Sequence, residues 1–177
     1  MKERSNIVID QSWYEKPDGI AERFSCGGVV CRVNESEEIL ILLTFEKDDR
    51  CFVLPKGGKE IGELDLDTAI REVGEEAGIN DLTLLADLGN LQRLSFAKNV
   101  WSNTHFFLFY TQQINGTPTD EEHFHEPSWF HLEDNDPYFW PDQKDLIKNN
   151  RLRITDLILK YHKHQYDTKQ GLGTQVK

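Results

Sequence analysis

The chain has 177 residues, of which 38% are hydrophobic and 11% aromatic, as is typical of one globular domain and not of a disordered or fibrous protein. Its 20 basic and 31 acidic residues give a formal net charge of −11, which disfavours non-specific binding to long polyanions such as DNA and RNA. No segment is apolar for long enough to span a membrane, and the start of the sequence lacks the apolar core of a signal peptide. We therefore expect small-molecule partners, with no membrane association and no stable nucleic-acid binding.

The chain opens with a polar N-terminal arm, residues 1–20, in which Trp13 and Tyr14 are candidates for packing on the rest of the protein. The main domain is expected over residues 21–165. Residues 166–177 are polar and contain two glycines, so they are predicted to form a flexible C-terminal tail.

Apolar runs bounded by turn residues predict the strands of the domain. They occupy residues 24–33, 39–45, 51–54, 82–91, 104–113 and 128–132. Residues 92–103 are expected to form a hairpin connection. Near the C-terminus, apolar residues at helical spacing predict helices over residues 142–149 and 152–164. Strands on both sides of a central helix imply an α/β fold with a mixed sheet flanked by helices.

That central helix is predicted by the most informative stretch of the chain, Gly57–Ile79, with the sequence GGKEIGELDLDTAIREVGEEAGI. Asp65 and Asp67 favour a helix start, and Gly78 is typical of a left-handed helix end. Between them, an apolar stripe recurs at three- and four-residue spacing. It consists of Leu66, Ala69, Ile70, Val73 and Ala77.

Glu72, Glu75 and Glu76 fall on one neighbouring arc of this helix. Three carboxylates so close repel each other unless a cation lies among them, and their hard oxygen atoms suit Mg²⁺ or Mn²⁺. A solvated acidic helix face is the alternative interpretation. The metal site is favoured because Gly57, Glu63, Arg71 and Gly78 stand around the triplet in the register of the family signature to which the stretch is compared below.

The three cysteines, Cys26, Cys31 and Cys51, are odd in number and show no C-x-x-C spacing. This favours reduced and packed thiols, and it predicts a cytoplasmic protein. A nucleophilic or zinc-binding role is the less favoured interpretation of each cysteine.

The stretch from Gly57 follows the pattern G-x5-E-x7-R-E-U-x-E-E-x-G-U, in which U is aliphatic, and it resembles the signature of Nudix pyrophosphohydrolases. The resemblance implies a Nudix-type α/β/α sandwich with a mixed sheet, and metal-dependent cleavage of a nucleoside diphosphate linked to another moiety. It also implies that the three helix glutamates ligate Mg²⁺ or Mn²⁺, with the Gly57 carbonyl as a further ligand. Arg71 is expected to pair with Glu63 and to orient the cluster.

The general base is implied to be either a glutamate of this signature or an acidic residue on a later loop. The loop candidates are Glu121, Glu122 and Glu126, of which we select Glu122. Lys56, Lys59 and Arg93 are candidates for holding phosphates, with Lys98 as a further possibility. Phe96 is a candidate for stacking on a base. For His105 a structural role is the favoured interpretation.

The entry Pro55-Lys56-Gly57 is similar to that of dinucleoside polyphosphate hydrolases, including the diadenosine tetraphosphate group. That group usually carries a tyrosine beyond the signature, where this chain has Phe96. A dinucleoside polyphosphate is therefore the leading substrate. A diphosphoinositol polyphosphate and an RNA 5′ end are the alternative substrates, and a non-catalytic nucleotide-sensing module is the alternative of another class.

Overall fold

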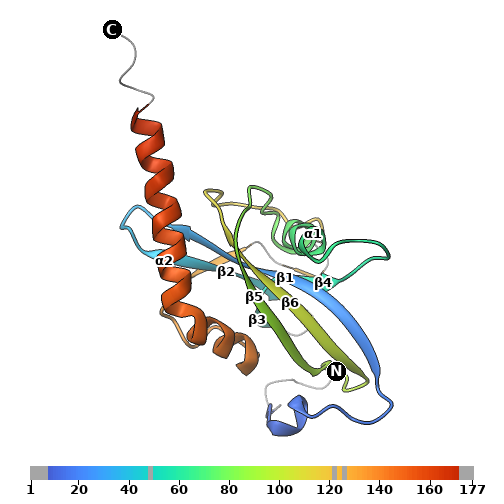
Figure 1. Cartoon of the computed structure of the whole chain (residues 1–177). Helices are drawn as coiled ribbons and strands as arrows, with labels where there is room; N and C mark the ends of the chain where they lie inside the picture. The colour runs from blue at the N-terminus through green and yellow to red at the C-terminus, as the bar shows by residue number, and fades with distance from the viewer. Residues whose placement is uncertain (1–7, 48–49, 121–122, 125–126, 172–177) are drawn as a thin grey trace.

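A mixed β-sheet with a helix against each face organises the computed structural model in Figure 1, which describes residues 8–47, 50–120, 123–124 and 127–171. The strands are β1 (Ala21–Val33), β2 (Ile39–Glu46), β3 (Cys51–Val53), β4 (Lys56–Gly58), β5 (Thr83–Leu94), β6 (Val100–Tyr110) and β7 (Ser128–His131). The flanking helices are α1 (Asp65–Ala77) and α2 (Pro141–Gly171). This arrangement confirms the predicted α/β/α sandwich.

The path of β1 through the sheet determines where the functional stretch lies. In the described residues the strand order is β3-β2-β1-β6-β5, with β4 paired to β1 and β7 paired to β2. β1 runs parallel to β6 and antiparallel to its other partners, so the sheet is mixed as predicted. The first half of β1 pairs with β4, with Cys26 opposite Gly57, and its second half pairs with β2. This change of partner brings the Gly57 turn into the sheet next to α1.

Each face of the sheet has its own hydrophobic core, because successive residues of a strand point to opposite sides. On one side, the buried cluster that includes α1 consists of Cys26, Val30, Leu42, Ala69, Val73, Ala77, Ile79, Phe107 and Phe109. On the other side, Val29, Phe106 and Leu108 belong to the cluster that includes α2. From α2 this cluster contains Leu146, Ile147, Ile154 and Ile158. The two cores pack α1 and the N-terminal part of α2 against the sheet.

The hairpin connection predicted over residues 92–103 is present, because β5 and β6 pair antiparallel across it, but its turn is shorter than predicted. β5 continues to Leu94 and β6 begins at Val100. Leu94 and Trp101 are each 5% exposed, and they pack in a third cluster with Trp13 and Trp140. The partners that bury these strand ends come from the N-terminal arm and from Trp140, just before α2, so local sequence does not reveal them.

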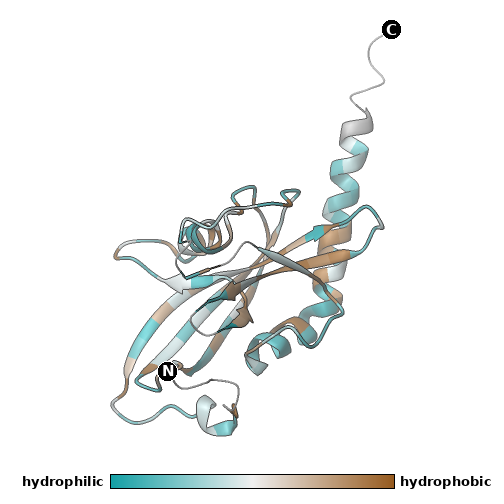
Figure 2. Cartoon of the chain, turned by 180° about the vertical axis from the view of Figure 1, so that it is seen from behind, coloured by the Kyte–Doolittle hydropathy of each residue, from teal (hydrophilic) through white to brown (hydrophobic). Residues whose placement is uncertain are grey.

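The two helices predicted near the C-terminus are one continuous helix, α2. Asn150, which lies in the predicted gap, is accommodated because its side-chain Nδ2 donates to the Leu146 carbonyl at 2.9 Å within the same helix. The C-terminal part of α2 extends beyond the sheet and is mostly hydrophilic (Figure 2). α2 reaches Gly171 and thus includes part of the predicted tail, while residues 172–177 lie outside the described residues. Within those described residues, no helix combines the length and the apolarity needed to cross a bilayer.

The N-terminal arm packs on the domain through Trp13, which is 4% exposed and lies in a short 3₁₀ helix, Gln11–Tyr14. The ring centroid of Trp13 lies 5.5 Å from that of Trp140 and 6.1 Å from that of Phe96. The ammonium of Lys98 lies 4.2 Å from the centre of the Trp13 ring. The packing considered for Trp13 from the sequence is therefore present.

Replacing Trp13 by alanine should lower the free energy of unfolding by about 3–5 kcal/mol, the range for deleting a large buried aromatic side chain. Urea denaturation followed by circular dichroism measures the change. Val8, which is 77% exposed, provides the control, and Val8→Ala should change the stability by less than about 0.5 kcal/mol. Equal unfolding midpoints for Trp13→Ala and the native chain would contradict the packing of the arm.

Candidate active site

The ends of α1, the helix that carries the predicted metal ligands, are determined by local sequence. Asp65 and Asp67 lie in its first turn, where carboxylates interact favourably with the positive end of the helix dipole. Gly78 has a φ of 66°, a left-handed conformation that favours glycine, and its N–H donates to the Gly74 carbonyl at 2.9 Å. The helix start and end predicted from the sequence are confirmed.

The buried face of α1 differs from the predicted apolar stripe at one position. Val73 and Ala77 are fully buried, as predicted, whereas Ile70 is 39% exposed. Glu72 and Glu76 belong to the buried arc instead, each with 8% exposure. The helix therefore turns two carboxylates, and not Ile70, towards the interior of the protein.

A glycine in β4 makes room for one of these carboxylates. A side-chain carbon placed on Gly57 would overlap the carboxyl group of Glu72. β4 holds Gly57 in this position through its pairing with β1. The turn and the helix that the sequence assigns to one site thus meet through a contact that requires glycine.

The guanidinium of Arg71 joins the loop before α1 to the carboxylates of the helix. Its Nε and Nη2 donate to the two carboxylate oxygens of Glu63 at 2.9 and 3.1 Å, and Nη2 also donates to the Gly58 carbonyl at 2.9 Å. Its Nη1 donates to Glu72 at 2.7 Å and to Glu75 at 3.0 Å. The predicted pairing of Arg71 with Glu63 is present as a bidentate ion pair, the strong and directional form.

The charges of this pair are fixed over the whole range in which proteins usually work. Hydrogen bonds from Arg71, and then from the Thr68 hydroxyl at 2.7 Å, lower the pKa of Glu63 to about 2. The hydrogen bonds to Glu63 raise the pKa of Arg71 in turn. The contact with Thr68 has no signal in the sequence pattern, since threonine at that position also suits a helix interior.

The negative charges of Glu72 and Glu76 are stabilised less completely by neighbouring groups than that of Glu63. Burial raises the pKa of Glu72, although the hydrogen bond from Arg71 opposes that shift. Burial also raises the pKa of Glu76 to about 8, opposed by the charge of Lys56 and by its backbone N–H, which donates to Glu76 Oε2 at 3.1 Å. Two neighbouring buried carboxylates are unfavourable, and a bound cation would stabilise both in their charged form.

The donor atoms of this cluster fit a hard divalent cation. All are oxygens, the ligands that Mg²⁺ and Mn²⁺ prefer, and they come from Glu72, Glu75, Glu76 and the Gly57 carbonyl. In the part of the chain that the structure describes, no three His, Cys, Asp or Glu side chains converge on a point suited to a metal ion. The contacts of Arg71 explain this, because its guanidinium draws Glu72 and Glu75 onto itself. Glu75 lies at the solvent edge, with 46% of its side chain exposed.

Two predicted phosphate-binding residues, Lys56 and Lys59, flank the Gly57 turn. Lys56 adjoins Glu76, and Lys59 pairs with Asp65 at the start of α1. The charge of Lys56 acts on Glu72 and Glu76, whereas Lys59 is engaged with Asp65. The loop glutamates predicted as candidates for the general base lie outside the described residues: Glu121, Glu122 and Glu126.

Arg93 and Phe96, which were predicted to contact the substrate, belong to the aromatic cluster at the β5–β6 turn. Arg93 is 8% exposed, its Nε lies 3.2 Å from Asp142 Oδ2, and its guanidinium lies 3.5 Å above the centre of the Trp140 ring. Phe96 packs against Trp13 and Trp140. The structure does not bring either residue into the carboxylate cluster, and a substrate contact for them stays a prediction.

His105 on β6 bridges two aspartates that are distant in sequence. Its Nδ1 lies 3.0 Å from Asp65 Oδ2, and its Nε2 lies 2.9 Å from Asp87 Oδ1, so the ring ties the start of α1 to β5. Burial lowers the pKa of His105, but the hydrogen bonds to both aspartates outweigh burial and raise the pKa. These contacts lower the pKa of Asp65 and of Asp87. The geometry agrees with the structural role favoured from the sequence, although neither partner was predicted.

The family description "NUDIX domain" matches residues 25–149 of the chain. No curated protein matches it in sequence. Among solved structures, an Ap4A hydrolase of C. elegans is similar with a TM-score of 0.59 and 24% identity, covering 75% of this chain and 98% of that one.

Two other solved structures are similar in fold at lower identity. The NUDIX domain of Shewanella oneidensis NrtR complexed with ADP ribose has a TM-score of 0.64 and 16% identity, over 83% of this chain and 99% of that one. A MutT NUDIX hydrolase from Burkholderia pseudomallei has a TM-score of 0.57 and 20% identity, over 72% of this chain and 96% of that one.

Arg93→Met should lower the free energy of unfolding by about 3–5 kcal/mol, because it leaves Asp142 buried without a counter-ion. The double variant Arg93→Met/Asp142→Leu should recover most of that loss, since it removes both charges. Urea denaturation of the three proteins measures the effect. A substrate-binding role for Arg93 predicts the opposite result, a raised KM with unchanged stability.

His105→Gln should destabilise the protein more at low pH than at high pH. Because the folded-state pKa of His105 is raised, its contribution is complete below the unfolded-state pKa of about 6.5 and is lost as the pH rises through the folded-state value. The native chain should exceed the variant by about 1 kcal/mol near pH 5.5 and by less near pH 9, allowing for the exposure of the aspartates. Urea denaturation at both pH values tests this, and a difference that grows with pH would contradict it.

Proposed function

This chain belongs to the NUDIX domain family and is a Nudix hydrolase, and we propose that it uses a divalent metal ion to cleave a phosphoanhydride bond in a nucleoside diphosphate-linked substrate. The proposed substrate is a dinucleoside polyphosphate, and the proposed ion is Mg²⁺ or Mn²⁺. One observation carries the proposal: Glu72 and Glu76 are buried together beside Gly57, on a helix whose third glutamate, Glu75, faces solvent. A purely structural helix would gain nothing from burying two carboxylates side by side.

The side chains of the cluster have different roles in the proposed reaction. A divalent ion held by Glu72, Glu75 and Glu76 would polarise phosphate oxygens and increase the acidity of bound water. Arg71 is a positioning residue, because it holds Glu72 and Glu75 through one nitrogen while the rest of its guanidinium is anchored to Glu63. Whether a signature glutamate or Glu122 accepts the proton of the attacking water stays a prediction.

The polyphosphate can be bound next to this cluster by cations of the same loop. Lys56 adjoins Glu76, and Lys59 stands at the start of α1 with a third of its side chain exposed. The solved structures with a similar fold include one titled an Ap4A hydrolase and one complexed with ADP ribose, which supports a nucleotide substrate without identifying it. The Pro55-Lys56-Gly57 entry favours the dinucleoside polyphosphate among the nucleotides.

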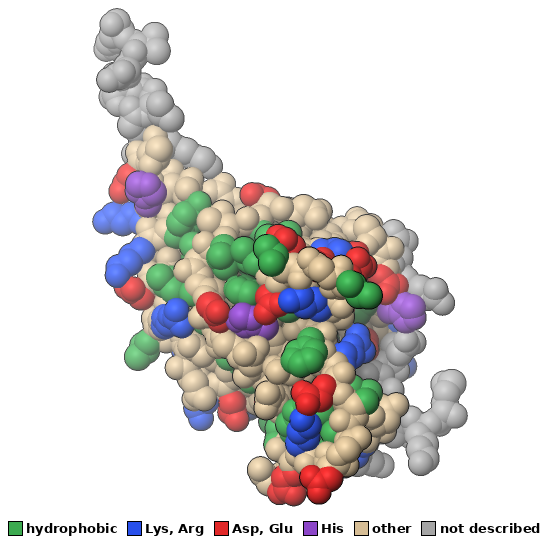
Figure 3. All heavy atoms as spheres, turned by 45° about the vertical axis from the view of Figure 1, so that its right-hand side comes forward, with side chains coloured by type: hydrophobic (Ala, Val, Ile, Leu, Met, Phe, Trp, Pro, Cys, Tyr) green, Lys and Arg blue, Asp and Glu red, His purple; other side chains and the backbone are tan. Residues whose placement is uncertain are grey.

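Two other substrate classes require more positive charge than this site offers. A diphosphoinositol polyphosphate or an RNA 5′ end carries dense negative charge and calls for a strongly basic surface. On the face in Figure 3, basic side chains stand among acidic ones and do not form one large patch. These substrates are therefore alternatives to the dinucleoside polyphosphate. A nucleotide-sensing module without turnover is the alternative of another class.

The cellular location we propose is the cytoplasm. Cys26, Cys31 and Cys51 are buried and form no disulfide with one another, and burial raises the pKa of Cys26 to about 11. Thiols of this kind are unreactive and suit a reducing compartment.

Glu76→Gln should reduce turnover of diadenosine tetraphosphate with Mg²⁺ or Mn²⁺ by about 100-fold or more, since losing even an outer-shell partner of a metal typically costs 10–100-fold. The substrate is identified by chromatography of the products formed from a panel of candidates. The panel holds dinucleoside polyphosphates, nucleoside triphosphates, ADP-ribose, diphosphoinositol phosphates and triphosphorylated RNA. Asp67→Asn on the exposed side of the same helix is the matched control, and it should retain native rates.

Each alternative has its own signature in this experiment. Preferred cleavage of another panel member would replace the substrate and keep the metal site. Full activity of Glu76→Gln would remove the metal role of that side chain. Nucleotide binding by the native chain without any turnover would establish the sensing module.

A further inference from the structure

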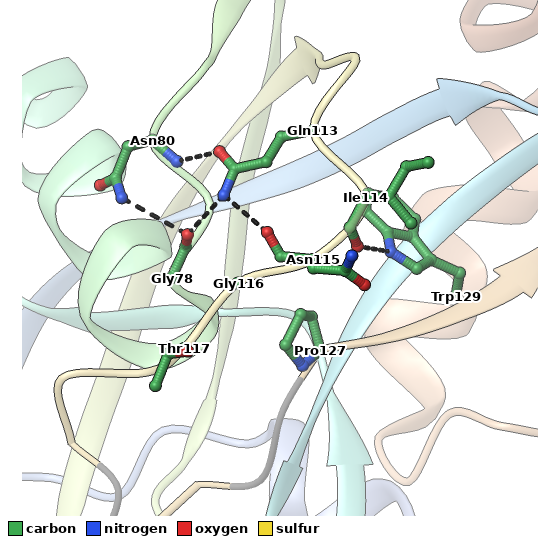
Figure 4. A pocket seen from close by; sticks show the side chains of 9 residues that line it. All are labelled: Gly78, Asn80, Gln113, Ile114, Asn115, Gly116, Thr117, Pro127 and Trp129. Atoms are coloured by element: carbon green, nitrogen blue, oxygen red, sulfur yellow. Dashed lines mark hydrogen bonds between the residues drawn. The ribbon is translucent and has the colours of Figure 1, made fainter.

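A pocket of about 580 Å³ lies at the C-terminal end of α1, where the chain leaves β6 (Figure 4). Its volume is in the range of sites for small organic ligands. The lining residues come from the end of the helix, the segment after β6 and the start of β7. They are Gly78, Asn80, Gln113, Ile114, Asn115, Gly116, Thr117, Pro127 and Trp129.

The chemistry of this lining is uncharged. Among the described residues that line it there is no Asp, Glu, Lys, Arg or His, although Asp, Glu, Lys and Arg together make up 29% of the chain. One wall is apolar and aromatic, with Trp129, Pro127 and the exposed Ile114, while Asn80 and Asn115 supply side-chain amides. Such a surface suits a planar ring with hydrogen-bonding edges, and it offers nothing to bind a phosphate.

Hydrogen bonds preform the pocket, and Gln113 makes most of them. Its Oε1 accepts from the backbone N–H groups of Asn80 and Asp81 at 2.9 and 3.2 Å. Its Nε2 donates to the carbonyls of Gly78 and Asn115, both at 2.8 Å (Figure 4). One amide side chain thus joins the end of α1 to the segment after β6, with all its hydrogen-bonding capacity used.

The aromatic wall is also held in place. Trp129 Nε1 donates to the Ile114 carbonyl at 2.8 Å, which fixes the indole against the opposite side of the pocket. The guanidinium of Arg32 lies 5.5 Å from the centre of the indole ring. A ring that is already fixed loses little conformational freedom when a ligand stacks on it.

The pocket lies at the C-terminal end of the same helix that carries the carboxylate cluster. Gly78 follows Glu75 by three residues, about 4.5 Å along the helix axis. The segment that forms the pocket continues to Thr119, whose N–H donates to the Glu75 carbonyl at 2.9 Å. A ligand whose phosphates lie at Glu75 can therefore have its uncharged end at Gly78.

We propose that this pocket binds the nucleoside at one end of the dinucleoside polyphosphate, while the phosphates lie at the carboxylate cluster. The inference rests on the proposed function for the identity of the substrate. The binding of a nucleoside to the pocket is a separate property that requires no turnover. In this arrangement the uncharged base and ribose contact the uncharged pocket, and the charged phosphates contact the lysines and the metal ion of the cluster.

Asn115→Leu is the test variant, because the exposed side chain of Asn115 lines the pocket. The substitution keeps the backbone carbonyl of residue 115, to which Gln113 donates. The variant should raise the KM for diadenosine tetraphosphate about tenfold with little change in kcat, in line with the loss of one hydrogen bond to the base or ribose. Asn149→Leu, an equally exposed asparagine on α2, is the matched control and should have native constants. Thermal melting checks that all three proteins are folded.

Direct binding of adenosine, guanosine, cytidine and uridine, measured by saturation-transfer NMR, separates the pocket from catalysis. Binding of a nucleoside to the native chain and its loss in Asn115→Leu supports the proposal, even if none of the nucleotides is cleaved and the proposed function fails. Nucleoside binding that Asn115→Leu leaves intact, or no binding of any of the four, overturns it. An unchanged KM in Asn115→Leu also overturns it while leaving the hydrolase activity in place. Trp129→Leu, with loss of the same binding, provides a second variant.

Discussion

The guanidinium of Arg71 is the constraint on which the site depends. It links the carboxylate of Glu63 and the carbonyl of Gly58, both in the chain before α1, to Glu72 and Glu75 on the helix. Without this link the loop could move relative to the helix, and the carboxylates would lose their common orientation. A lysine could not replace it, because a single ammonium lacks the planar set of donors that reaches these acceptors together.

The sheet supplies the second half of the same arrangement. β4 has only three residues, Lys56–Gly58, and it is held by pairing with the first half of β1. This short strand places the Lys56 N–H on Glu76 and leaves space at Gly57 for Glu72. The carboxylates are thus buried by strand pairing, and the groups that the same strand and Arg71 present oppose the rise in their pKa values that burial causes. The residues that bury the carboxylates and the donors that stabilise their charge belong to neighbouring parts of the chain, so a change in one affects the other.

Sequence predicted the parts of the structure that depend on local pattern. The ends of α1, the Arg71–Glu63 pair and the alternating strands follow from capping residues, spacing and periodicity. Features that depend on distant partners were not predicted. Ile70 fits the apolar stripe by spacing but is exposed, because the sheet meets an arc that includes Glu72 instead. Arg93 had no visible counter-ion, since Asp142 is 49 positions away and becomes its neighbour only when α2 packs on the sheet.

A chain with a net charge of −11 can accept a polyanion only where local charge differs from the average. The carboxylate cluster alone would repel phosphates, so its use as a phosphate site depends on a cation that reverses the sign of its field. At the end of the same helix the situation is different, because Gln113 hydrogen-bonds the carbonyl of Gly78 and no charged side chain of the described residues lines the pocket. One helix therefore offers two environments about one turn apart, the first strongly dependent on a cation and the second independent of it. A substrate with a charged centre and uncharged ends is the kind of molecule that can use both.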